Sequence, residues 1–266
     1  MPTYPISFPN LNISFFINPV AISIFGLNIH WYGILIVAAI LIGLFLAKRD
    51  DGLHDIKFDD VFDFALIGIF SAIIFARLYF VLFNLDYYKN NLVEIFSVWN
   101  GGLAIYGGII GGVLAALIFC KIKKINFLNL CDYLVPFLAL GQSIGRWGNF
   151  INQEAYGYAT ESFLKMRIYS KEVGVFLNVH PTFLYESILD LFIFILLMLV
   201  RKKRKFSGQL LYIYLGIYGM GRFIIEGLRT DSLMMMNFRV SQVLSGFLVI
   251  LSVILYYFGE KCRRKE

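Results

Sequence analysis

Charge, cysteine and histidine are all scarce in this sequence. Only 16% of its 266 residues are charged, whereas about a quarter is usual for a soluble domain. The three cysteines are odd in number and lack a C-x-x-C spacing, which argues against a disulfide framework or a zinc site. The three histidines are scattered without metal-ligand spacing. We therefore expect neither a metal nor another cofactor.

Several catalytic motifs are also absent. The chain contains no G-x-S-x-G, no Walker phosphate-binding loop and no H-E-x-x-H. Its first ten residues lack the basic start that is typical of a cleavable signal peptide. The formal net charge of +6 comes from short basic clusters between apolar runs, not from one basic face. We therefore expect no nucleic-acid partner.

Long apolar runs dominate instead. Hydrophobic residues make up 59% of the chain, and a spanning helix needs about 20 consecutive apolar residues. Continuous runs rich in Leu, Ile and Phe favour helices over the alternating strands of a membrane barrel. We predict an all-α integral membrane protein, a seven-transmembrane-helix bundle that forms a single membrane domain over residues 1–266. The expected spans are 25–47, 61–84, 101–120, 127–147, 182–200, 208–227 and 239–258.

Lysine and arginine give the expected orientation, because they accumulate in cytoplasmic loops. With the basic clusters inside, seven spans place the N-terminus outside and the C-terminus in the cytoplasm. A long loop of about 148–181 then lies outside. The clusters also suit contact with anionic lipid headgroups. They comprise Lys48, Arg49, Lys57, Lys121, Lys123, Lys124, residues 201–205, Lys261, Arg263, Arg264 and Lys265.

Some charged residues occur inside or beside the predicted spans, where a charge needs a partner or a wet cavity. Arg77 lies deep in the second span, and Arg146 lies near the end of the fourth. Arg222 and Glu226 are four residues apart late in the sixth span, so they share one helix face, and Arg229 follows. An internal salt bridge would explain the Arg222–Glu226 pair alone. Several arginines with few nearby acids favour a bound anion such as a lipid phosphate, which guanidinium groups bind well.

The stretch GQSIGRWGNFINQEAYG, residues 141–157, ends the fourth apolar run in an amide-rich cluster. Asn149, Asn152 and Gln153 each offer hydrogen-bond donors and acceptors. Such residues either cap a helix and shape a turn, or hold the hydroxyl and phosphate groups of a ligand. The cap role is the usual one for asparagine, but the density of polar groups at a membrane boundary weakens it.

Two other classes of protein compete with an enzyme. A transporter or lipid scramblase favours inverted repeats and helices broken at the membrane midplane, and the sequence shows no such repeat. A structural scaffold would explain the glycine pairs at 101–102, 107–108 and 111–112, because small residues let helices pack closely. Such glycines also make room for a lipid chain or a ligand. A scaffold does not explain the converging arginines.

The segment GRWGNFINQEAYG, residues 145–157, closely resembles the signature of the bacterial phosphatidylglycerol–prolipoprotein diacylglyceryl transferase family. That signature runs Gly-Arg-x-Gly/Ala-Asn-Phe-x-Asn-x-Glu-x-x-Gly, and the chain matches each specified position. Five further segments similar to the family occur in the same order, so the resemblance spans nearly the full length. They are IHWYG (29–33), ARLYFVLF (76–83), GGLAIYGG (101–108), HPTFLYE (180–186) and RFIIEGLR (222–229).

The resemblance implies that the diacylglyceryl group of phosphatidylglycerol moves to the lipobox cysteine thiol of a prolipoprotein signal peptide. The product is a thioether, glycerol 1-phosphate leaves, and the reaction is the first step of bacterial lipoprotein maturation. The implied location is the bacterial cytoplasmic (inner) membrane, with a multi-pass chain and an active site toward the outer leaflet. We expect membrane lipids as further partners and a monomeric enzyme.

Site residues follow from fitting the resemblance to this chemistry. Negative charge grows on the phosphate as the C–O bond breaks, and preorganised cations stabilise that transition state. The resemblance gives this catalytic role to Arg146 and Arg222, and Glu226 then orients Arg222. The residues implied for substrate binding, beside Arg146, are Asn149, Asn152, Glu154, Gly157, Arg77, Arg229, Tyr218 and His30.

The proton acceptor stays open. Tyr106 occupies a position where some members of the family carry a histidine that is a candidate base. Tyrosine, with an ordinary pKa of about 10, is a poor base. Our hypothesis is that Tyr106 donates or relays a hydrogen bond and that the arginine charges help to form the thiolate. Tyr32, which we count among the catalytic residues, is an alternative proton acceptor, as are His30 and Glu154.

Overall fold

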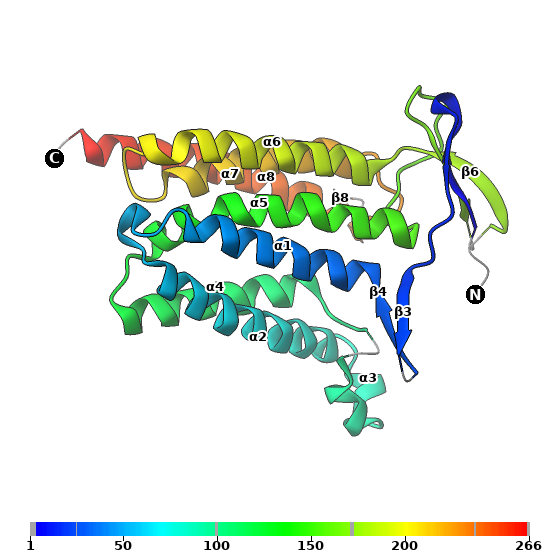
Figure 1. The fold of residues 1–266 in the computed structure, drawn as a ribbon, viewed down its shortest axis with the longest axis horizontal. Helices are drawn as coiled ribbons and strands as arrows, with labels where there is room; N and C mark the ends of the chain where they lie inside the picture. The colour runs from blue at the N-terminus through cyan, green and yellow to red at the C-terminus, as the bar shows by residue number, and fades with distance from the viewer. Residues whose placement is uncertain (1–3, 25, 99–100, 171–172, 237, 265–266) are drawn as a thin grey trace. The chain divides into compact units, whose positions relative to one another are not determined.

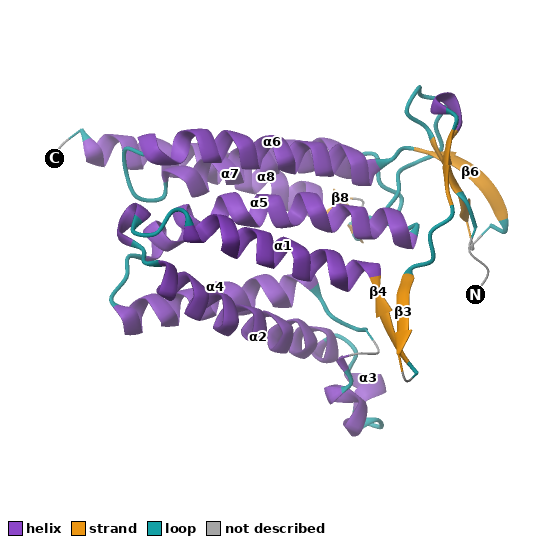
Figure 2. Ribbon diagram, in the orientation of Figure 1, coloured by secondary structure: helices purple, strands orange, loops and turns teal. Residues whose placement is uncertain are grey.

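The computed structural model describes residues 4–24, 26–98, 101–170, 173–236 and 238–264. The chain forms two compact units, which are described one at a time. The first unit comprises residues 1–46 and 134–266, and the second comprises residues 47–133. Figure 1 traces the elements along the chain, and Figure 2 shows that helices make up most of it.

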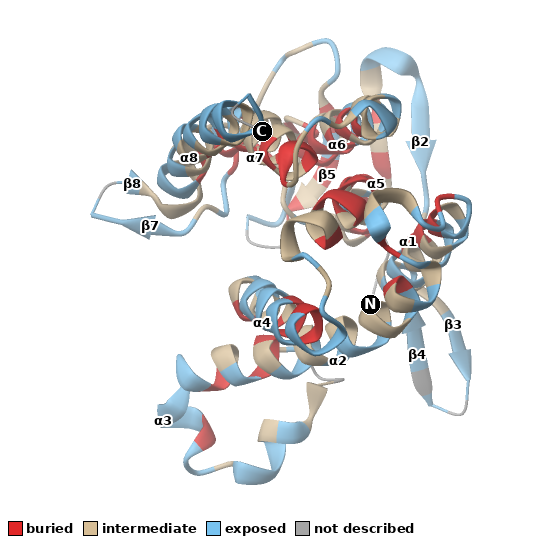
Figure 3. Cartoon of the chain, turned by 90° about the vertical axis from the view of Figure 1, so that its left-hand side faces the viewer, coloured by how far each residue is buried: buried red, intermediate tan, exposed pale blue. Residues whose placement is uncertain are grey.

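Long helices build the first unit. Apolar side chains of α5, α6 and α7 form a buried core that comprises Val135, Ala139, Ile193, Leu197, Leu210 and Tyr214. By contrast, α8 buries only 11% of its most apolar stretch, and Figure 3 shows its mostly exposed surface. An apolar surface of this kind suits contact with lipid. The helices are α1 (Trp31–Lys48), α5 (Phe127–Asn152), α6 (Thr182–Val200), α7 (Gln209–Glu226) and α8 (Val240–Arg263).

Short strands lie at one end of these helices (Figure 2). Four of them form an antiparallel sheet in the order β2-β1-β5-β6. Buried residues of the sheet pack on Phe150 of α5 and Phe183 of α6, so the sheet is attached to the helix ends. The strands are β1 (Ile6–Phe8), β2 (Ile13–Phe15), β5 (Met166–Ser170) and β6 (Val175–Val179), with hairpins β3 (Val20–Ile24)–β4 (Leu27–His30) and β7 (Met234–Met235)–β8 (Phe238–Arg239). The 3-10 turns are η1 (Pro9–Leu11) and η5 (Arg201–Lys203).

Two long helices pack together in the second unit through glycine. A Cβ built on Gly111 would lie 2.6 Å from Phe75 Cβ, and one on Gly107 would lie 2.9 Å from Ala76 Cα. Gly112 has open space instead. Gly107 and Gly111, the first glycines of the pairs 107–108 and 111–112, therefore serve helix packing, which was one of the two roles predicted for the glycine pairs. The elements are η2 (Leu53–Asp55), α2 (Phe58–Leu82), α3 (Leu85–Tyr88), η3 (Leu92–Phe96) and α4 (Ile105–Lys123).

The predicted helical membrane fold is confirmed in its main feature. Among the described residues, six helices are long and apolar enough to cross a membrane, namely α1, α2, α4, α5, α6 and α8. The remaining long helix, α7, has a more polar sequence that contains Gln209, Arg222 and Glu226. The seventh crossing and the orientation of the termini stay predictions.

Four of the predicted span boundaries differ from the helix ends by four residues or more. The first helix begins at Trp31 and not at 25, because the preceding residues form the β3–β4 hairpin. The third begins at Ile105 and not at 101, because Gly101 and Gly102 adopt φ of 85° and 73°, a left-handed conformation that glycine favours. The fourth continues to Asn152, so the following loop begins later than predicted. The last continues to Arg263 and not only to 258.

Candidate active site

The signature segment forms the last turns of α5 and the turn that follows. Gln153 adopts φ of 55°, the left-handed conformation that commonly ends a helix. The chain then folds back, and the Glu154 amide donates to the Asn149 carbonyl at 3.0 Å. Glu154 Oε1 accepts hydrogen bonds from Asn149 Nδ2 at 2.9 Å and from Asn152 Nδ2 at 3.2 Å. Three predicted site residues therefore meet at this helix end, where they shape the turn.

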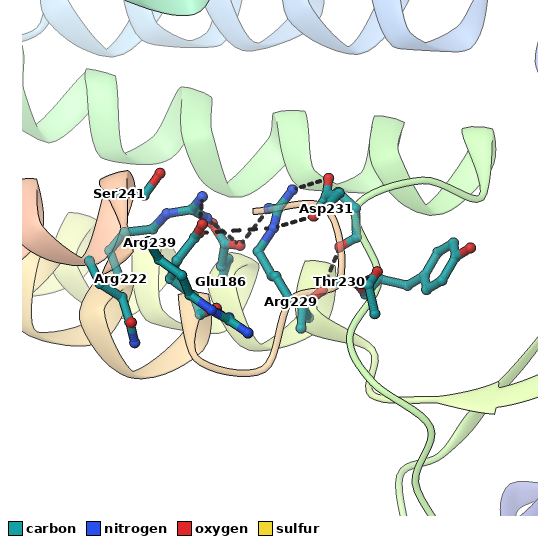
Figure 4. Close-up of polar contacts among 12 residues, drawn as sticks. Glu186, Arg222, Arg229, Thr230, Asp231, Arg239 and Ser241 are labelled. Atoms are coloured by element: carbon teal, nitrogen blue, oxygen red, sulfur yellow. Dashed lines mark hydrogen bonds and ion pairs between the residues drawn. The ribbon is translucent and has the colours of Figure 1, made fainter. Parts of the chain in front are cut away.

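A buried carboxylate gathers arginines from three parts of the first unit. Glu186 of α6 has a side chain that is only 2% exposed. Its Oε1 and Oε2 each accept from Arg222 Nη1 at 2.7 Å, and Oε1 also accepts from Arg229 Nη1 at 3.2 Å (Figure 4). Arg146 Nη2 forms an ion pair with Glu186 Oε2. Arginines from α5, from α7 and from the segment after α7 thus meet at one anion.

Two more carboxylates pair with these arginines. Arg222 Nη2 lies 2.6 Å from Glu226 Oε2, so the two residues share one face of α7 as their spacing predicts. Arg229 donates to both oxygens of Asp231, from Nε at 2.9 Å and from Nη2 at 2.7 Å. Burial raises the pKa of Asp231, but the hydrogen bonds and charge of Arg229 outweigh it and hold that pKa below its usual value. Asp231 is therefore ionised at neutral pH and neutralises Arg229.

The expectation that the arginines have few acidic neighbours was wrong. Arg146, Arg222 and Arg229 each contact at least one carboxylate, and their side chains are only 19%, 16% and 10% exposed. The reason is tertiary, because Glu186 is far from all three in the sequence. A guanidinium has five N–H donors, so these contacts fix each arginine without using every donor. We refer to Arg146, Glu186, Arg222, Glu226, Arg229 and Asp231 as the Glu186 cluster.

Gly157 lies where the loop after α5 crosses the segment after α7. It forms a bridge with Arg229, and its amide donates to the His180 carbonyl at 3.0 Å. The next amide, that of Tyr158, donates to the Leu228 carbonyl at 2.8 Å. A Cβ at Gly157 would lie 2.8 Å from both His180 Cβ and the Leu228 carbonyl oxygen. The absence of a side chain thus lets the loop lie directly against the Glu186 cluster.

The other predicted site residues of the first unit are spread over three elements. Tyr32, in the first turn of α1, packs its ring against Gly148, where a Cβ would clash with the ring. This contact puts Tyr32 beside the signature segment. His30 is the last residue of β4 and is exposed. Tyr218 of α7 stacks on Tyr214, with ring centroids 5.4 Å apart.

Arg77 and Tyr106 belong to the second unit. Arg77 is 6% exposed, and it donates four hydrogen bonds to backbone carbonyls. These bonds run from Nε to Ile95 at 2.9 Å, from Nη1 to Gly101 at 2.7 Å and Gly102 at 2.9 Å, and from Nη2 to Glu94 at 2.5 Å. This geometry favours a structural use of Arg77, which joins η3 to the glycine turn before α4. Tyr106 lies in the first turn of α4 and is partly exposed.

Glu186 was missing from the predicted site, although the sequence carries a signal for it. Glu186 and Asp190 are four residues apart in an apolar run, so they share one helix face. Charged residues in such a run usually mark function. Asp190 is fully buried, and neither of its carboxylate oxygens has a hydrogen-bond partner among the described residues. Among all the residues that the structure describes, no three His, Cys, Asp or Glu side chains group as metal ligands.

Comparison with known proteins identifies the family. A family model described as prolipoprotein diacylglyceryl transferase matches residues 19–258. The phosphatidylglycerol–prolipoprotein diacylglyceryl transferase of Clostridioides difficile is 48% identical over 242 residues, which cover 91% of this chain and 95% of that protein. Proteins of the same name from Finegoldia magna and Listeria welshimeri are 48% and 44% identical, over 89% of this chain and 93% and 88% of their own lengths. The chain therefore belongs to the prolipoprotein diacylglyceryl transferase family.

Proposed function

We propose that this chain transfers the diacylglyceryl group of phosphatidylglycerol to the lipobox cysteine thiol of a prolipoprotein. The cysteine sulfur forms a bond to the glycerol carbon that carries the phosphate, and the C–O bond at that carbon breaks. The bonding electron pair leaves with the phosphate oxygen, which gives glycerol 1-phosphate, and the thiol loses its proton. Family membership supports this transfer.

The observation that carries the proposal is the convergence of three arginines on Glu186. Figure 4 labels two of them, Arg222 and Arg229, together with Glu186. Charge develops on the leaving phosphate as the C–O bond breaks, and donors fixed before the reaction stabilise it without further reorganisation. Glu186 supplies that fixation, because a buried carboxylate holds each guanidinium in place. The cluster is thus suited to bind a phosphate group that has entered beside the helix ends.

Arg146 is our choice for the main phosphate contact. Its side chain is the most exposed of the three. It forms an ion pair with Glu186 and a long contact of 3.5 Å with Asn149 Oδ1. Arg222 is held by two carboxylates, and Glu226 keeps it in orientation. Arg229 guides the phosphate or the peptide from the segment that follows α7.

The amide-rich turn positions the headgroup in this proposal. Glu154 holds Asn149 and Asn152 in one place, so their remaining acceptors and donors are available to glycerol hydroxyls. Gly157 brings the loop backbone close to Arg229. His30 and Tyr218 stay predictions for substrate binding, and so does Arg77.

More than one group is a candidate to accept the proton of the substrate thiol. We propose that Tyr106 donates or relays a hydrogen bond while the arginine charges favour the thiolate. Tyr32, His30 and Glu154 are the alternative acceptors, and Tyr32 is placed beside the signature segment by its contact with Gly148. Turnover of Tyr106→Phe checks this proposal, and we expect a loss of about tenfold, as for one lost hydrogen bond. Wild-type turnover in that variant would remove Tyr106 from the chemistry.

The proposed setting is the bacterial cytoplasmic membrane with the site toward the outer leaflet. We propose that α7 is the seventh crossing, that the N-terminus is outside and that the C-terminus is in the cytoplasm. The strands of the first unit then lie outside, at the end of the helices where the Glu186 cluster occurs. A single membrane domain of residues 1–266 and a monomeric enzyme remain parts of this proposal.

Mass spectrometry tests the proposed function. Purified protein in detergent is mixed with phosphatidylglycerol and a synthetic lipobox peptide. We expect the peptide to gain one diacylglyceryl group on its cysteine, with one glycerol 1-phosphate released per peptide. The matched control is a peptide with serine in place of the cysteine, which should stay unmodified. A folded preparation that leaves the cysteine peptide unmodified would contradict the proposal.

A further inference from the structure

Arg239 is a fourth arginine at the edge of the Glu186 cluster, and it was not among the predicted site residues. It lies in β8, immediately before α8. Its Nη2 donates to Tyr158 Oη at 2.6 Å, and its Nη1 donates to the backbone carbonyl of Glu226. The guanidinium carbon also lies over the Tyr158 ring, 5.5 Å from the centroid. Figure 4 shows Arg239 in the same view as Glu186 and Arg229.

The partners of Arg239 distinguish it from the other arginines. Arg146, Arg222 and Arg229 each contact a carboxylate, whereas over the described ranges Arg239 contacts none. Its acceptors are a phenol and a peptide carbonyl, and both are neutral. The positive charge of Arg239 is therefore not cancelled by a direct ion pair. A guanidinium that has no carboxylate partner gains more binding free energy from a phosphate than one that already binds a carboxylate.

The position of Arg239 also favours contact with a ligand. Arg239 is partly exposed, and its partner Tyr158 is 49% exposed, so a ligand can reach them. Arg239 contacts the backbone of Glu226, whose side chain pairs with Arg222. Its other partner, Tyr158, follows the residue that bridges to Arg229. Arg239 thus borders the cluster where the cluster meets solvent.

We propose that Arg239 is a phosphate-binding residue that engages a glycerol phosphate group at the outer edge of the Glu186 cluster. The group belongs either to phosphatidylglycerol on entry or to glycerol 1-phosphate on release. Arg239 exchanges its neutral acceptors for phosphate oxygens when that group binds. The inference rests on the proposed function and adds a residue to its substrate site. Because Arg239 lies at the edge, it acts on capture or release and not on the C–O bond cleavage.

Kinetics of Arg239→Gln test the proposal against a matched control, Arg167→Gln. Arg167 of β5 also lies over an aromatic ring, 5.2 Å from the Phe176 centroid, and among the described residues it contacts no carboxylate. Initial rates are measured in mixed micelles against phosphatidylglycerol concentration at saturating lipobox peptide. Inhibition by added glycerol 1-phosphate is measured in the same assay.

We expect Arg239→Gln to raise the KM for phosphatidylglycerol or the Ki for glycerol 1-phosphate by about tenfold, the loss of one charge-assisted hydrogen bond. Its kcat should stay within about twofold of wild type, and Arg167→Gln should keep wild-type constants. A raised KM identifies the lipid phosphate as the ligand, and a raised Ki alone identifies the released product. An unchanged KM together with an unchanged Ki would overturn the proposal.

A second variant separates phosphate binding from a role in holding the loop. Tyr158→Phe removes the hydroxyl that accepts from Arg239 but leaves the arginine in place, so we expect wild-type KM and Ki. If Tyr158→Phe reproduces the effect of Arg239→Gln, the arginine only fastens the loop and the proposal fails. Arg239→Met, which keeps the apolar stem over Tyr158, replaces Arg239→Gln if that variant does not fold. A wild-type protein without transfer activity would instead overturn the proposed function, and this inference with it.

Discussion

At the scale of single residues, Glu186 holds the site together. It is buried in α6, and it contacts arginines from α5, from α7 and from the segment after α7. Removing one partner of a buried ion pair is costly, because the remaining charges stay buried without compensation. Glu186 therefore has a structural effect, and under the proposed function it also affects catalysis, because it fixes Arg146 and Arg222.

Glu186→Gln should lower both stability and turnover. We expect a loss of about 3–5 kcal/mol of unfolding free energy, the usual cost of breaking a buried ion pair. Turnover in the folded fraction should fall about 100-fold, because the arginines lose their fixed orientation. Thermal unfolding in detergent and the peptide-transfer assay measure the two effects.

The matched control for that experiment is Glu161→Gln. Glu161 forms an ion pair with Lys165 near the protein surface, and the hydrogen bond from Lys165 lowers the pKa of Glu161. We expect wild-type stability and turnover for this variant, since surface ion pairs contribute little. A Glu186→Gln protein as stable and active as Glu161→Gln would refute the role of Glu186.

The residues of the site were predictable only in part. Arg146 and Arg222 stood out because charges are rare in apolar runs, and the Arg222–Glu226 contact followed from helix spacing. The meeting of these arginines with Glu186 depends on how α5, α6 and α7 pack, which no local pattern encodes. The expectation that few acids lie near these arginines was wrong for that reason.

At the scale of elements, the helices were more predictable than the strands. A spanning helix requires a long apolar run, and the runs agree with α2, α6 and α7 to within three residues at each end. The strands contain only two to five residues each, too few for a reliable alternating pattern. The residues of β4 also continue the apolar run of α1, so the first span was predicted to begin too early.

Because two loops cross closely at Gly157, we expect one added methyl group there to lower both stability and turnover. In Gly157→Ala, the new Cβ would meet His180 Cβ and the Leu228 carbonyl at 2.8 Å. We expect a loss of about 1–3 kcal/mol, as for overpacking elsewhere, together with reduced turnover because the loop moves away from Arg229. Thermal unfolding and peptide transfer are the measurements.

Gly141→Ala provides the comparison for Gly157→Ala. Gly141 lies within α5, and a Cβ there meets nothing within 4 Å. Alanine in a helix interior is favoured over glycine by about 0.5–1 kcal/mol, so this variant should be as stable as wild type or more so. Equal behaviour of the two variants would show that the close contact at Gly157 is unimportant.

At the scale of the whole molecule, the first unit has its strands and its basic turn at opposite ends of the helices, as in a protein that spans a membrane. Its strands occur before α1, between α5 and α6, and between α7 and α8, so they gather at one end of the helices (Figure 2). The basic turn η5 lies between α6 and α7, at their other ends. Because basic residues favour the cytoplasm, the strands are expected outside.

Thiol labelling in intact bacteria tests this orientation. Cys262, near the end of α8, is exposed, and the proposed topology places it in the cytoplasm. In a Cys120→Ser, Cys131→Ser background, a membrane-impermeant maleimide should label Cys262 only after the cells are made permeable. Phe163→Cys, at a loop position that is 67% exposed, should be labelled in intact cells once Cys262 is also replaced by serine. Labelling of Cys262 in intact cells would contradict the topology.

The most direct test of the central claim, that the Glu186 cluster stabilises the leaving phosphate, is the turnover of Arg146→Gln beside Arg167→Gln. Glu186 keeps Arg222 and Arg229 as partners when Arg146 is replaced, so we expect the protein to fold. We predict that kcat falls about 10²–10³-fold in Arg146→Gln, as when one transition-state donor is removed, and that Arg167→Gln keeps the wild-type rate. A folded Arg146→Gln protein that transfers diacylglyceryl at nearly the wild-type rate would contradict the claim.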